Sequence, residues 1–167
     1  MSVLGTTNGS TDSINEFLRL MHNGHVKEAV IFLEQKKKLE QEHILLGDPN
    51  VIWMPIYYGE GNRLIRLIGK QSHEAQEKIL CISRVVRDFV NKGYEKEIFT
   101  LIKGLLPTAQ IKILCVGDAE ESLRKAGLEE GIDNMRKNWP LDLLEAICPG
   151  KKSLTRAGNG APSFDFR

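Results

Sequence analysis

The stretch that decides the fold is SINEFLRLMHNGHVKEAVIFLEQKKK, which runs from Ser13 to Lys38. Its first half has apolar residues at helical spacing, namely Ile14, Phe17, Leu18 and Met21. Ser13 and Glu16 form a capping-box pattern, which predicts the start of this helix. Gly24 predicts its end, because glycine adopts the left-handed conformation that closes a helix at little cost. The apolar spacing then resumes with Val26, Ala29, Val30 and Leu33. We therefore predict two short antiparallel helices joined at Gly24.

Length and composition indicate a single folded domain. The chain has 167 residues, of which 41% are hydrophobic and 27% charged, and 23 basic against 22 acidic residues leave a formal charge of +1. These nearly equal numbers of basic and acidic residues exclude a global electrostatic attraction to nucleic acid or to an anionic membrane. No uninterrupted apolar run approaches the roughly 18 residues needed to span a bilayer. We expect a soluble cytoplasmic protein that does not insert into a membrane.

The ends of the chain differ in composition from its middle. Residues 1–12 are rich in Gly, Ser, Thr and Asn, which predicts a disordered, mobile leader. Residues 150–167 are small, polar and basic apart from a few apolar side chains, which predicts a flexible tail. Residues 13–149 are then expected to form one helical domain.

The middle of the chain is predicted to be mainly α-helical. Apolar spacing and end signals predict further helices at 62–69, 72–92, 94–106, 118–127, 128–138 and 141–147. For two segments the sequence does not decide between a helix and a strand. Residues 51–58 are β-branched and aromatic and contain Pro55, which favours an extended conformation. Residues 109–116 suit a buried strand, whereas Pro107 suits the first turn of a helix.

Four glycines are spaced almost evenly along the predicted helices. Gly24, Gly59, Gly93 and Gly127 are separated by 35, 34 and 34 residues. Stacked helical hairpins have periods of this size, because a single hairpin cannot bury its apolar face alone. The same glycines would also be expected as helix caps in an irregular antiparallel helical bundle. The fold class is therefore antiparallel helical hairpins, packed either as an irregular bundle or as a short repeat stack.

The unit around Gly24 resembles tetratricopeptide and pentatricopeptide repeats. In those families a glycine between two helices is followed by an apolar residue, an alanine and a larger apolar residue, which are Val26, Ala29 and Leu33 here. The resemblance is best in this unit and looser in the others, where Pro55 interrupts the second. It implies stacked antiparallel helical hairpins.

No sequence pattern of a common catalytic or cofactor site is present. His22 and His25 lack a third metal ligand nearby, and Cys81, Cys115 and Cys148 form no CxxC pair. We expect reduced cysteines, no metal and no cofactor. A strand at 113–117 leading into a helix at Asp118 would be the nearest approach to a nucleotide site, but the acidic residues there would repel a phosphate. A small α/β enzyme built around 51–58 and 111–117 is the most remote hypothesis.

The residues most suggestive of function are a basic stripe and the aromatic residues before it. Arg63, Arg66 and Lys70 lie on one side of a predicted helix and follow Trp53, Tyr57 and Tyr58. Cations beside aromatic rings suit RNA, and the same side chains suit a protein interface or an ordinary solvated surface. Lys36, Lys37 and Lys38 would add to an RNA-binding surface or form a solvated one. Our leading hypothesis is a non-catalytic interaction protein that binds a protein partner or itself, and the alternative is an RNA-binding regulatory or viral accessory protein.

Overall fold

The computed structural model describes the backbone of residues 2–149 and the side chains of residues 11–149. Within this range every regular element is helical and no strand occurs, which confirms the mainly α prediction. The elements are α1 (Ser2–His22), α2 (Val26–Glu34), α3 (Lys38–Gly47), α4 (Pro49–Tyr57), α5 (Gly61–Gly69), α6 (His73–Leu80), α7 (Val85–Asn91), α8 (Glu95–Lys103), α9 (Pro107–Leu114), α10 (Ala119–Leu123), η1 (Arg124–Leu128), α11 (Glu129–Arg136) and α12 (Leu141–Ile147).

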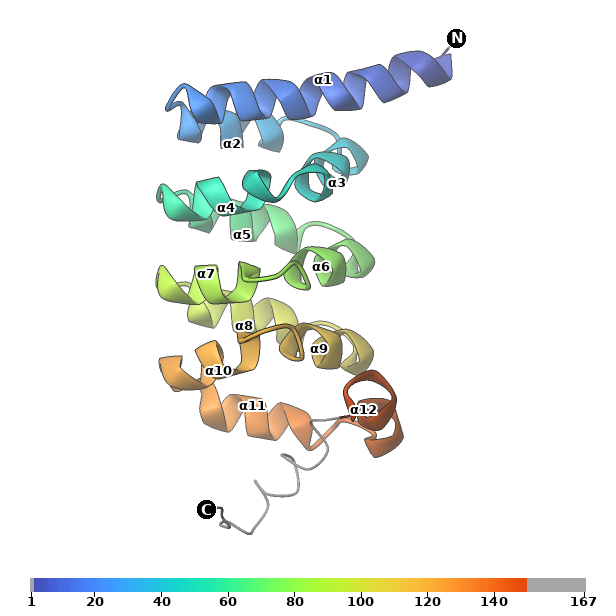
Figure 1. Ribbon diagram of the computed structural model, residues 1–167, viewed down its shortest axis with the longest axis vertical. Coiled ribbons are helices and arrows are strands. Elements are labelled where there is room, and N and C mark those ends of the chain that lie inside the picture. Colours follow the sequence, from blue (N-terminus) through green and yellow to red (C-terminus); the bar gives the residue numbers. More distant parts are fainter. Residues whose placement is uncertain (1, 150–167) are drawn as a thin grey trace.

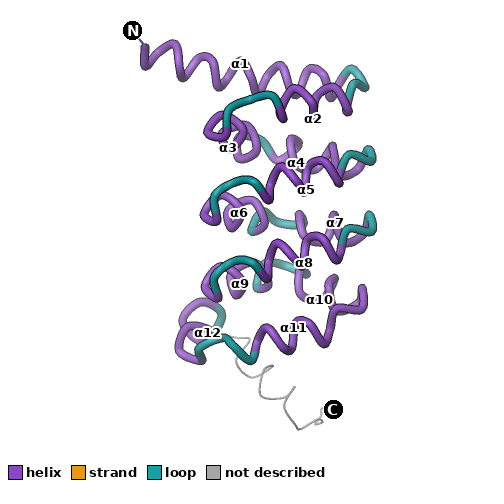
Figure 2. Tube along the Cα trace, turned by 180° about the vertical axis from the view of Figure 1, so that it is seen from behind, coloured by secondary structure: helices purple, strands orange, loops and turns teal. Residues whose placement is uncertain are grey.

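These helices form a stack of successive units, which after the first are each about as long as the glycine spacing. The first unit is longer because α1 extends back to Ser2. Over residues 2–149 the units are α1–α3, α4–α6, α7–α9 and α10–α12, the last including η1. Helices α4, α7 and α10 form a column at the front of the stack, and α5, α8 and α11 lie behind them (Figure 1). The view from the opposite side brings α5, α8 and α11 forward (Figure 2). We call the outward sides of these two columns the front face (α1, α4, α7, α10) and the rear face (α2, α5, α8, α11). The third helices, α3, α6, α9 and α12, lie along one edge.

The evenly spaced glycines form the turn between the front and rear helix of each unit. Their φ angles are +84° for Gly24, +95° for Gly59, +93° for Gly93 and +97° for Gly127. In the first unit the amide of His25 donates to the carbonyl of Leu20 at 2.8 Å, and Glu60 and Tyr94 make the equivalent bonds to Pro55 and Phe89 at 2.8 and 3.0 Å. This six-residue closure is the usual helix end with a left-handed glycine. The glycine spacing therefore marks a recurring turn.

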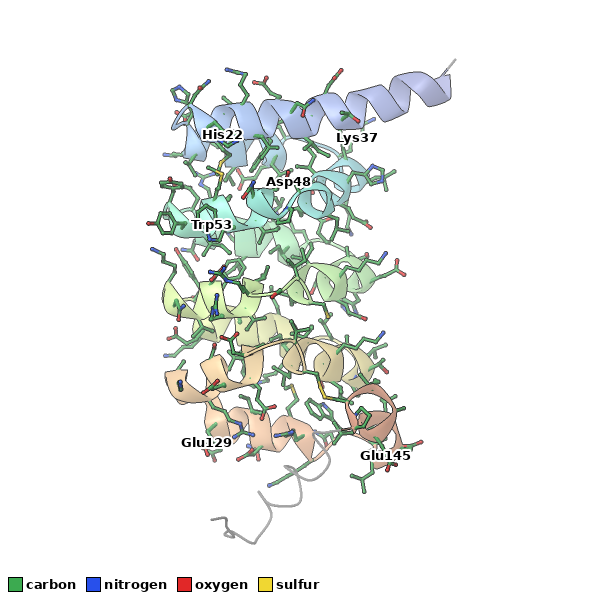
Figure 3. The ribbon with its side chains drawn as sticks, viewed as in Figure 1. His22, Lys37, Asp48, Trp53, Glu129 and Glu145 are labelled. Carbon is green, nitrogen blue, oxygen red and sulfur yellow. A yellow bond between two sulfur atoms is a disulfide. The ribbon has the colours of Figure 1, made fainter. Side chains whose placement is uncertain are left out.

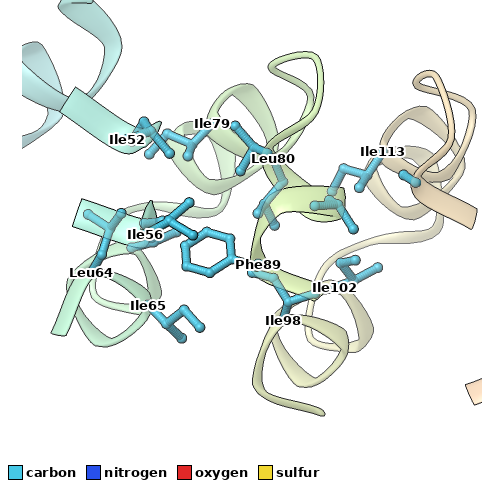
Figure 4. Close-up of a cluster of buried hydrophobic side chains, with 14 of the residues drawn as sticks. Ile52, Ile56, Leu64, Ile65, Ile79, Leu80, Phe89, Ile98, Ile102 and Ile113 are labelled. Atoms are coloured by element: carbon cyan, nitrogen blue, oxygen red, sulfur yellow. The ribbon is translucent and has the colours of Figure 1, made fainter. Parts of the chain in front are cut away.

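The core runs continuously through the units. Each unit buries branched aliphatic and aromatic side chains against the next, as the cluster around Phe89 shows (Figure 4). One pair of core positions is apolar in the first three units, as Phe17 with Leu33, Ile52 with Ile68, and Val86 with Ile102. In the fourth unit the same spacing places Glu120 and Arg136 there, and the Arg136 Nη1 donates to a Glu120 carboxylate oxygen at 2.8 Å.

A buried glutamine recurs in the edge helix of the first three units. The side-chain amides of Gln41, Gln76 and Gln110 donate to carbonyls at the end of the preceding rear helix, at 2.9 to 3.3 Å. Carbonyls at a helix end lack partners within the helix. Each glutamine therefore satisfies them and fastens the edge helix to the rear helix of its own unit.

The two segments left open between helix and strand are both helical. Residues 51–58 fall largely within α4, so the extended conformation favoured there is wrong. The Asp48 side chain accepts from the amide of Asn50 at 2.9 Å, and Pro49 occupies the first turn, where proline suits a helix. Pro55 is buried inside the helix and removes one backbone donor near its end. Residues 109–116 belong mainly to α9, whose first turn holds Pro107.

Two helix boundaries also differ from the prediction. The helix expected over 72–92 is divided into α6 and α7, and Arg84 between them has a φ of +76°. The helical spacing of apolar residues continues across this break, so the sequence pattern does not reveal the turn. Helix α1 begins at Ser2, so it includes most of the segment expected as a disordered leader. The Ser13 hydroxyl donates to a Glu40 carboxylate oxygen at 2.9 Å instead of capping a helix start. The tail expected at 150–167 lies outside the described residues.

The cysteines depart from the expectation of three reduced thiols. Cys115 and Cys148 form a disulfide across the last two units, with their Cα atoms 6.5 Å apart. Both residues follow edge helices, and Cys81 follows the preceding one, so the three are spaced by 34 and 33 residues. Cys81 is a thiol, and its partial burial, together with the nearby Glu77, raises its pKa. This disfavours the reactive thiolate.

Candidate functional site

Three exposed aromatic side chains gather on the front face at the second unit. Trp53, Tyr57 and Tyr58 are 39%, 53% and 55% exposed, and Trp53 is labelled in Figure 3. Trp53 and Tyr57 are four residues apart in α4, so they share one side of the helix. Their rings stack with centroids 5.2 Å apart and planes 14° apart. Tyr58 meets Tyr57 edge to face, with centroids 5.1 Å apart. The rings therefore form one ordered aromatic patch.

A lysine of the third unit extends the patch along the stack. The Lys92 Nζ lies 4.8 Å from the centroid of the Tyr57 ring, which is the geometry of a cation–π contact. Lys92 follows the end of α7, and Arg84 directly precedes its start. Both are exposed, and neither forms an ion pair with another residue of the described chain. Arg84 stands at the other end of α7 from the rings, near Val116 and Asp118. We call Trp53, Tyr57, Tyr58 and Lys92, together with Arg84, the front-face site.

The residue type at the position equivalent to Trp53 changes from unit to unit. The equivalent residues in the four units are Leu18, Trp53, Arg87 and Glu121. The buried sides of the same helices are almost uniformly apolar. Leu18 packs partly against the core, whereas Trp53, Arg87 and Glu121 give this position an aromatic, a basic and an acidic group in the next three units.

A hollow lies beside the front-face site, between α7 and α10. Its volume is about 400 Å³, and Arg87, Asn91, Asp118, Glu121 and Lys125 contribute to its lining. Arg87 pairs with Asp118 across the two units at 3.1 Å, and Lys125 pairs with Glu121 at 3.2 Å. Its charged groups thus largely neutralise one another.

The basic stripe predicted to join the aromatic residues lies on a different face. Arg63 and Arg66 belong to α5 and Lys70 directly follows it, whereas the aromatic residues lie on or next to α4. Helices α4 and α5 occupy opposite sides of the stack (Figures 1 and 2). Arg63 is also paired with Glu34 at 3.0 Å and with Glu60 at 3.5 Å. The structure therefore does not combine this stripe and these rings in one site.

The three consecutive lysines form a separate feature of the first unit. The Lys36 Nζ lies 4.4 Å from the centroid of the Phe32 ring. Lys37 precedes α3, as Figure 3 shows, and Lys38 is the first residue of that helix. Lys37 and Lys38 are exposed. Glu40 and Gln41 follow on the same helix, so this segment begins a partly buried edge helix.

The described residues offer little support for the remote enzyme hypothesis. Among them no group of three or more His, Cys, Asp and Glu side chains is placed to hold a metal ion. Ile113 and Leu114 end the helix α9, and Asp118 precedes the five-residue α10. The strand-to-helix arrangement considered for a nucleotide is therefore not present at 113–118.

Sequence reasoning found the aromatic residues but missed Arg84 and Lys92. Aligning the chain on its four glycines would have exposed Lys92, because this alignment places it at the position of Tyr58, which directly follows Tyr57. The alignment gives no comparable sign of Arg84. The recurring glutamines could be found in the same way, from spacings of 35 and 34 residues.

Within residues 2–149, no helix has both the length and the apolar character that crossing a bilayer requires. Comparison of the chain with models of known protein families, with curated proteins and with solved structures finds no match.

Proposed function

We propose that the protein is a non-catalytic interaction module that binds a protein partner through the front-face site. The observation that carries this proposal is the ordered, exposed aromatic patch of Trp53, Tyr57 and Tyr58. Tryptophan, tyrosine and arginine contribute a large share of binding energy at protein interfaces. Side chains already held in place lose less conformational entropy when a partner binds.

The architecture supports the same proposal. Stacked helical units commonly present extended binding surfaces. A tetratricopeptide repeat has two helices in 34 residues, whereas the second and third units of this chain each divide a similar length among three short helices. The proposed likeness to such repeats therefore concerns the glycine turn and the mode of stacking, and the binding surface is argued from this chain's own residues.

RNA is the second candidate, and the charge distribution makes it the weaker one. Base stacking on the aromatic patch and phosphate contacts from Lys92 would suit a single strand. However, Arg87 and Lys125 are already paired with Asp118 and Glu121, and Arg63 is paired on the rear face, so few cations are free to contact phosphates. A protein partner needs fewer cations than a nucleic acid backbone does.

The proposal is tested by selecting binders from a random peptide display library on the purified protein. Each selected peptide is then measured against Trp53→Ala/Tyr57→Ala and against the rear-face control Arg66→Glu/Lys70→Glu. We expect the front-face variant to lose binding by about tenfold or more, as for interface hot spots, and the control to retain it. Selected peptides that bind both variants equally would overturn the proposal.

Two further measurements test whether RNA or a second copy of this chain, and not another protein, binds the front-face site. A labelled single-stranded RNA is titrated at two salt concentrations, and tight, salt-sensitive binding lost in the front-face variant would favour RNA. Light scattering of the wild type and the front-face variant tests self-association. A dimer that becomes a monomer in Trp53→Ala/Tyr57→Ala would identify a second copy as the partner.

A further inference from the structure

We infer that the partner presents an acidic segment, in which carboxylates flank an aromatic or large apolar side chain. This inference rests on the proposed function and adds the chemistry of the partner. It is carried by the charges at α7 and α10, where Asp88, Asp118 and Glu121 have partners within the chain, whereas Arg84 and Lys92 pair with no carboxylate of the described residues.

The acidic side chains of α7 and at α10 each have a cation nearby. Asp118 lies 3.1 Å from the Arg87 guanidinium, and Asp88 lies 3.9 Å from the same group. Glu121 pairs with Lys125 at 3.2 Å. In the first unit, Glu16 pairs with Arg19 at 2.6 Å, and this contact lowers the pKa of the Glu16 carboxyl. A basic partner would therefore have to compete with existing pairs.

The cations of the front-face site are in the opposite situation. Arg84 and Lys92 stand at the two ends of α7, both are exposed, and neither pairs with a carboxylate of the described residues. Helix α4 beside them contains no charged residue. Asp48 precedes α4 and accepts from the amide of Asn50 as its cap. Beside the aromatic rings the charge left open to a partner is therefore that of Lys92, and complementary charge on the partner would be negative.

The position of Lys92 links this charge to the aromatic patch. Its ammonium group lies over the Tyr57 ring at 4.8 Å, so a carboxylate that binds the ammonium lies next to the rings. An ammonium group has three donors, so it can keep the ring contact while it donates to a carboxylate. A partner segment that binds both features needs an apolar side chain for Trp53 and Tyr57 and a carboxylate close to it in sequence.

The inference is tested with fluorescein-labelled peptides of one sequence pattern and three charges. The acidic probe is EEFEELFEE, the neutral probe replaces each Glu with Gln, and the basic probe replaces each Glu with Lys. Binding is followed by anisotropy and by intrinsic fluorescence, because Trp53 is exposed whereas Trp139, the other tryptophan, is only 7% exposed. We expect the acidic probe to bind at least about tenfold more tightly than the neutral one, with the difference shrinking as salt is raised.

Matched variants assign the preference to the two cations. Arg84→Glu/Lys92→Glu should abolish or reverse the preference for the acidic probe, whereas Arg66→Glu/Lys70→Glu, which removes two exposed cations from the rear side, should leave it unchanged. Preservation of the helical circular dichroism spectrum shows that each variant is folded.

The possible results separate this inference from the proposed function. Binding that ignores probe charge but is lost in Trp53→Ala/Tyr57→Ala overturns the inference and leaves the proposed function standing. An acidic preference that survives Arg84→Glu/Lys92→Glu also overturns it. If none of the three probes binds, the library selection decides, since front-face binders without enrichment in Asp and Glu contradict an acidic partner. Front-face binding of RNA in place of all peptides would overturn both proposals.

Discussion

The first three units and the last one have side chains of opposite chemistry at the same pair of buried positions. Where the earlier units bury two apolar side chains between front and rear helix, the last unit buries Glu120 against Arg136. Their side chains are 11% and 9% exposed, and Glu120 also accepts from Arg124 at 2.8 Å. The Arg136 Nε is buried with no hydrogen-bond partner among the described residues. The comparison shows that the backbone of the unit is compatible with either chemistry. Because burying an ion pair carries a desolvation cost, we expect the apolar pair to be at least as stable.

The largest expected effect comes from breaking this buried pair. Glu120→Val leaves Arg136 buried without its carboxylate, which should lower the free energy of unfolding by about 3–5 kcal/mol. Glu120→Val/Arg136→Ile recreates the Val86–Ile102 pair of the third unit and should restore wild-type stability or exceed it by roughly 1–4 kcal/mol. Urea unfolding followed by circular dichroism measures both.

The exposed pair Glu121–Lys125 supplies the control for these variants. Its side chains are largely exposed, so Glu121→Ala should change the free energy of unfolding by less than about 1 kcal/mol. A double variant as unstable as Glu120→Val would show that the last unit cannot accept the apolar pair. The equivalence of the four units at this position would then be wrong.

The second effect concerns the covalent link, which the last two units have and the earlier ones lack within the described residues. Cys115 and Cys148 are 33 residues apart, and closing a loop of this size restricts the unfolded chain. Reduction, or Cys148→Ser under non-reducing conditions, should lower the free energy of unfolding by about 2–4 kcal/mol. Trp139, buried between the same units, should report the change through its fluorescence.

Cys81→Ser provides the matched control, because Cys81 follows the equivalent edge helix without a disulfide. Its unfolding should respond to reductant as the wild type does. A wild-type protein whose unfolding is indifferent to reductant, with two more thiols than expected in a thiol assay, would contradict the disulfide.

The third effect tests the glutamine that joins the last two units. The Gln110 amide donates to three carbonyls, and its oxygen accepts from the Trp139 indole at 2.8 Å. Gln110→Leu leaves these buried groups without partners and should cost about 1–3 kcal/mol. Thermal unfolding measures the loss, and Trp139 fluorescence should shift at the same time.

Gln41→Leu is the comparison, since Gln41 donates to the carbonyls of Leu33 and Glu34 and accepts from Gln71. It should destabilise the chain without changing the environment of Trp139. A fluorescence change of equal size in both variants would argue against a specific role for the Gln110–Trp139 bond.

Much of this architecture could be predicted from local signals, and the failures have physical causes. Glycine turns were predictable because a left-handed residue at a helix end strongly favours glycine, and Gly24 and its equivalents all have positive φ. Pro55 led to the wrong prediction of an extended segment, because proline is usually unfavourable inside a helix. In α4, burial of the surrounding apolar residues outweighs the loss of one backbone hydrogen-bond donor. Arg84 could not be foreseen, because it adopts a positive φ without glycine or another turn signal at its position.

The candidate site shows the same limit. Trp53, Tyr57 and Tyr58 could be predicted to be important from their chemistry, but proximity in sequence suggested Arg63 as their neighbour. The glycine turn between α4 and α5 sends that arginine to the rear, and stacking of the units supplies Lys92 instead. Contacts between units follow from the repeat geometry, which neighbouring residues in the sequence do not reveal.

The smallest expected effect concerns the two linkers before α7 and α10. Variants of Arg84 distinguish the effect of backbone strain on stability from the effect of the side-chain charge on binding. The first has Arg84 at a φ of +76°, whereas the second has Gly117 at +49°. A left-handed residue other than glycine costs roughly 1–2 kcal/mol, and the extra entropy of an unfolded glycine offsets about half of this. Arg84→Gly should therefore raise the free energy of unfolding by about 0.5 kcal/mol, whereas Arg84→Gln keeps the strain and should leave it unchanged. Both variants remove the charge, so both should weaken binding of the acidic probe equally. Equal stability of the two variants would mean that packing between units, and not the side chain at position 84, determines the cost of this turn.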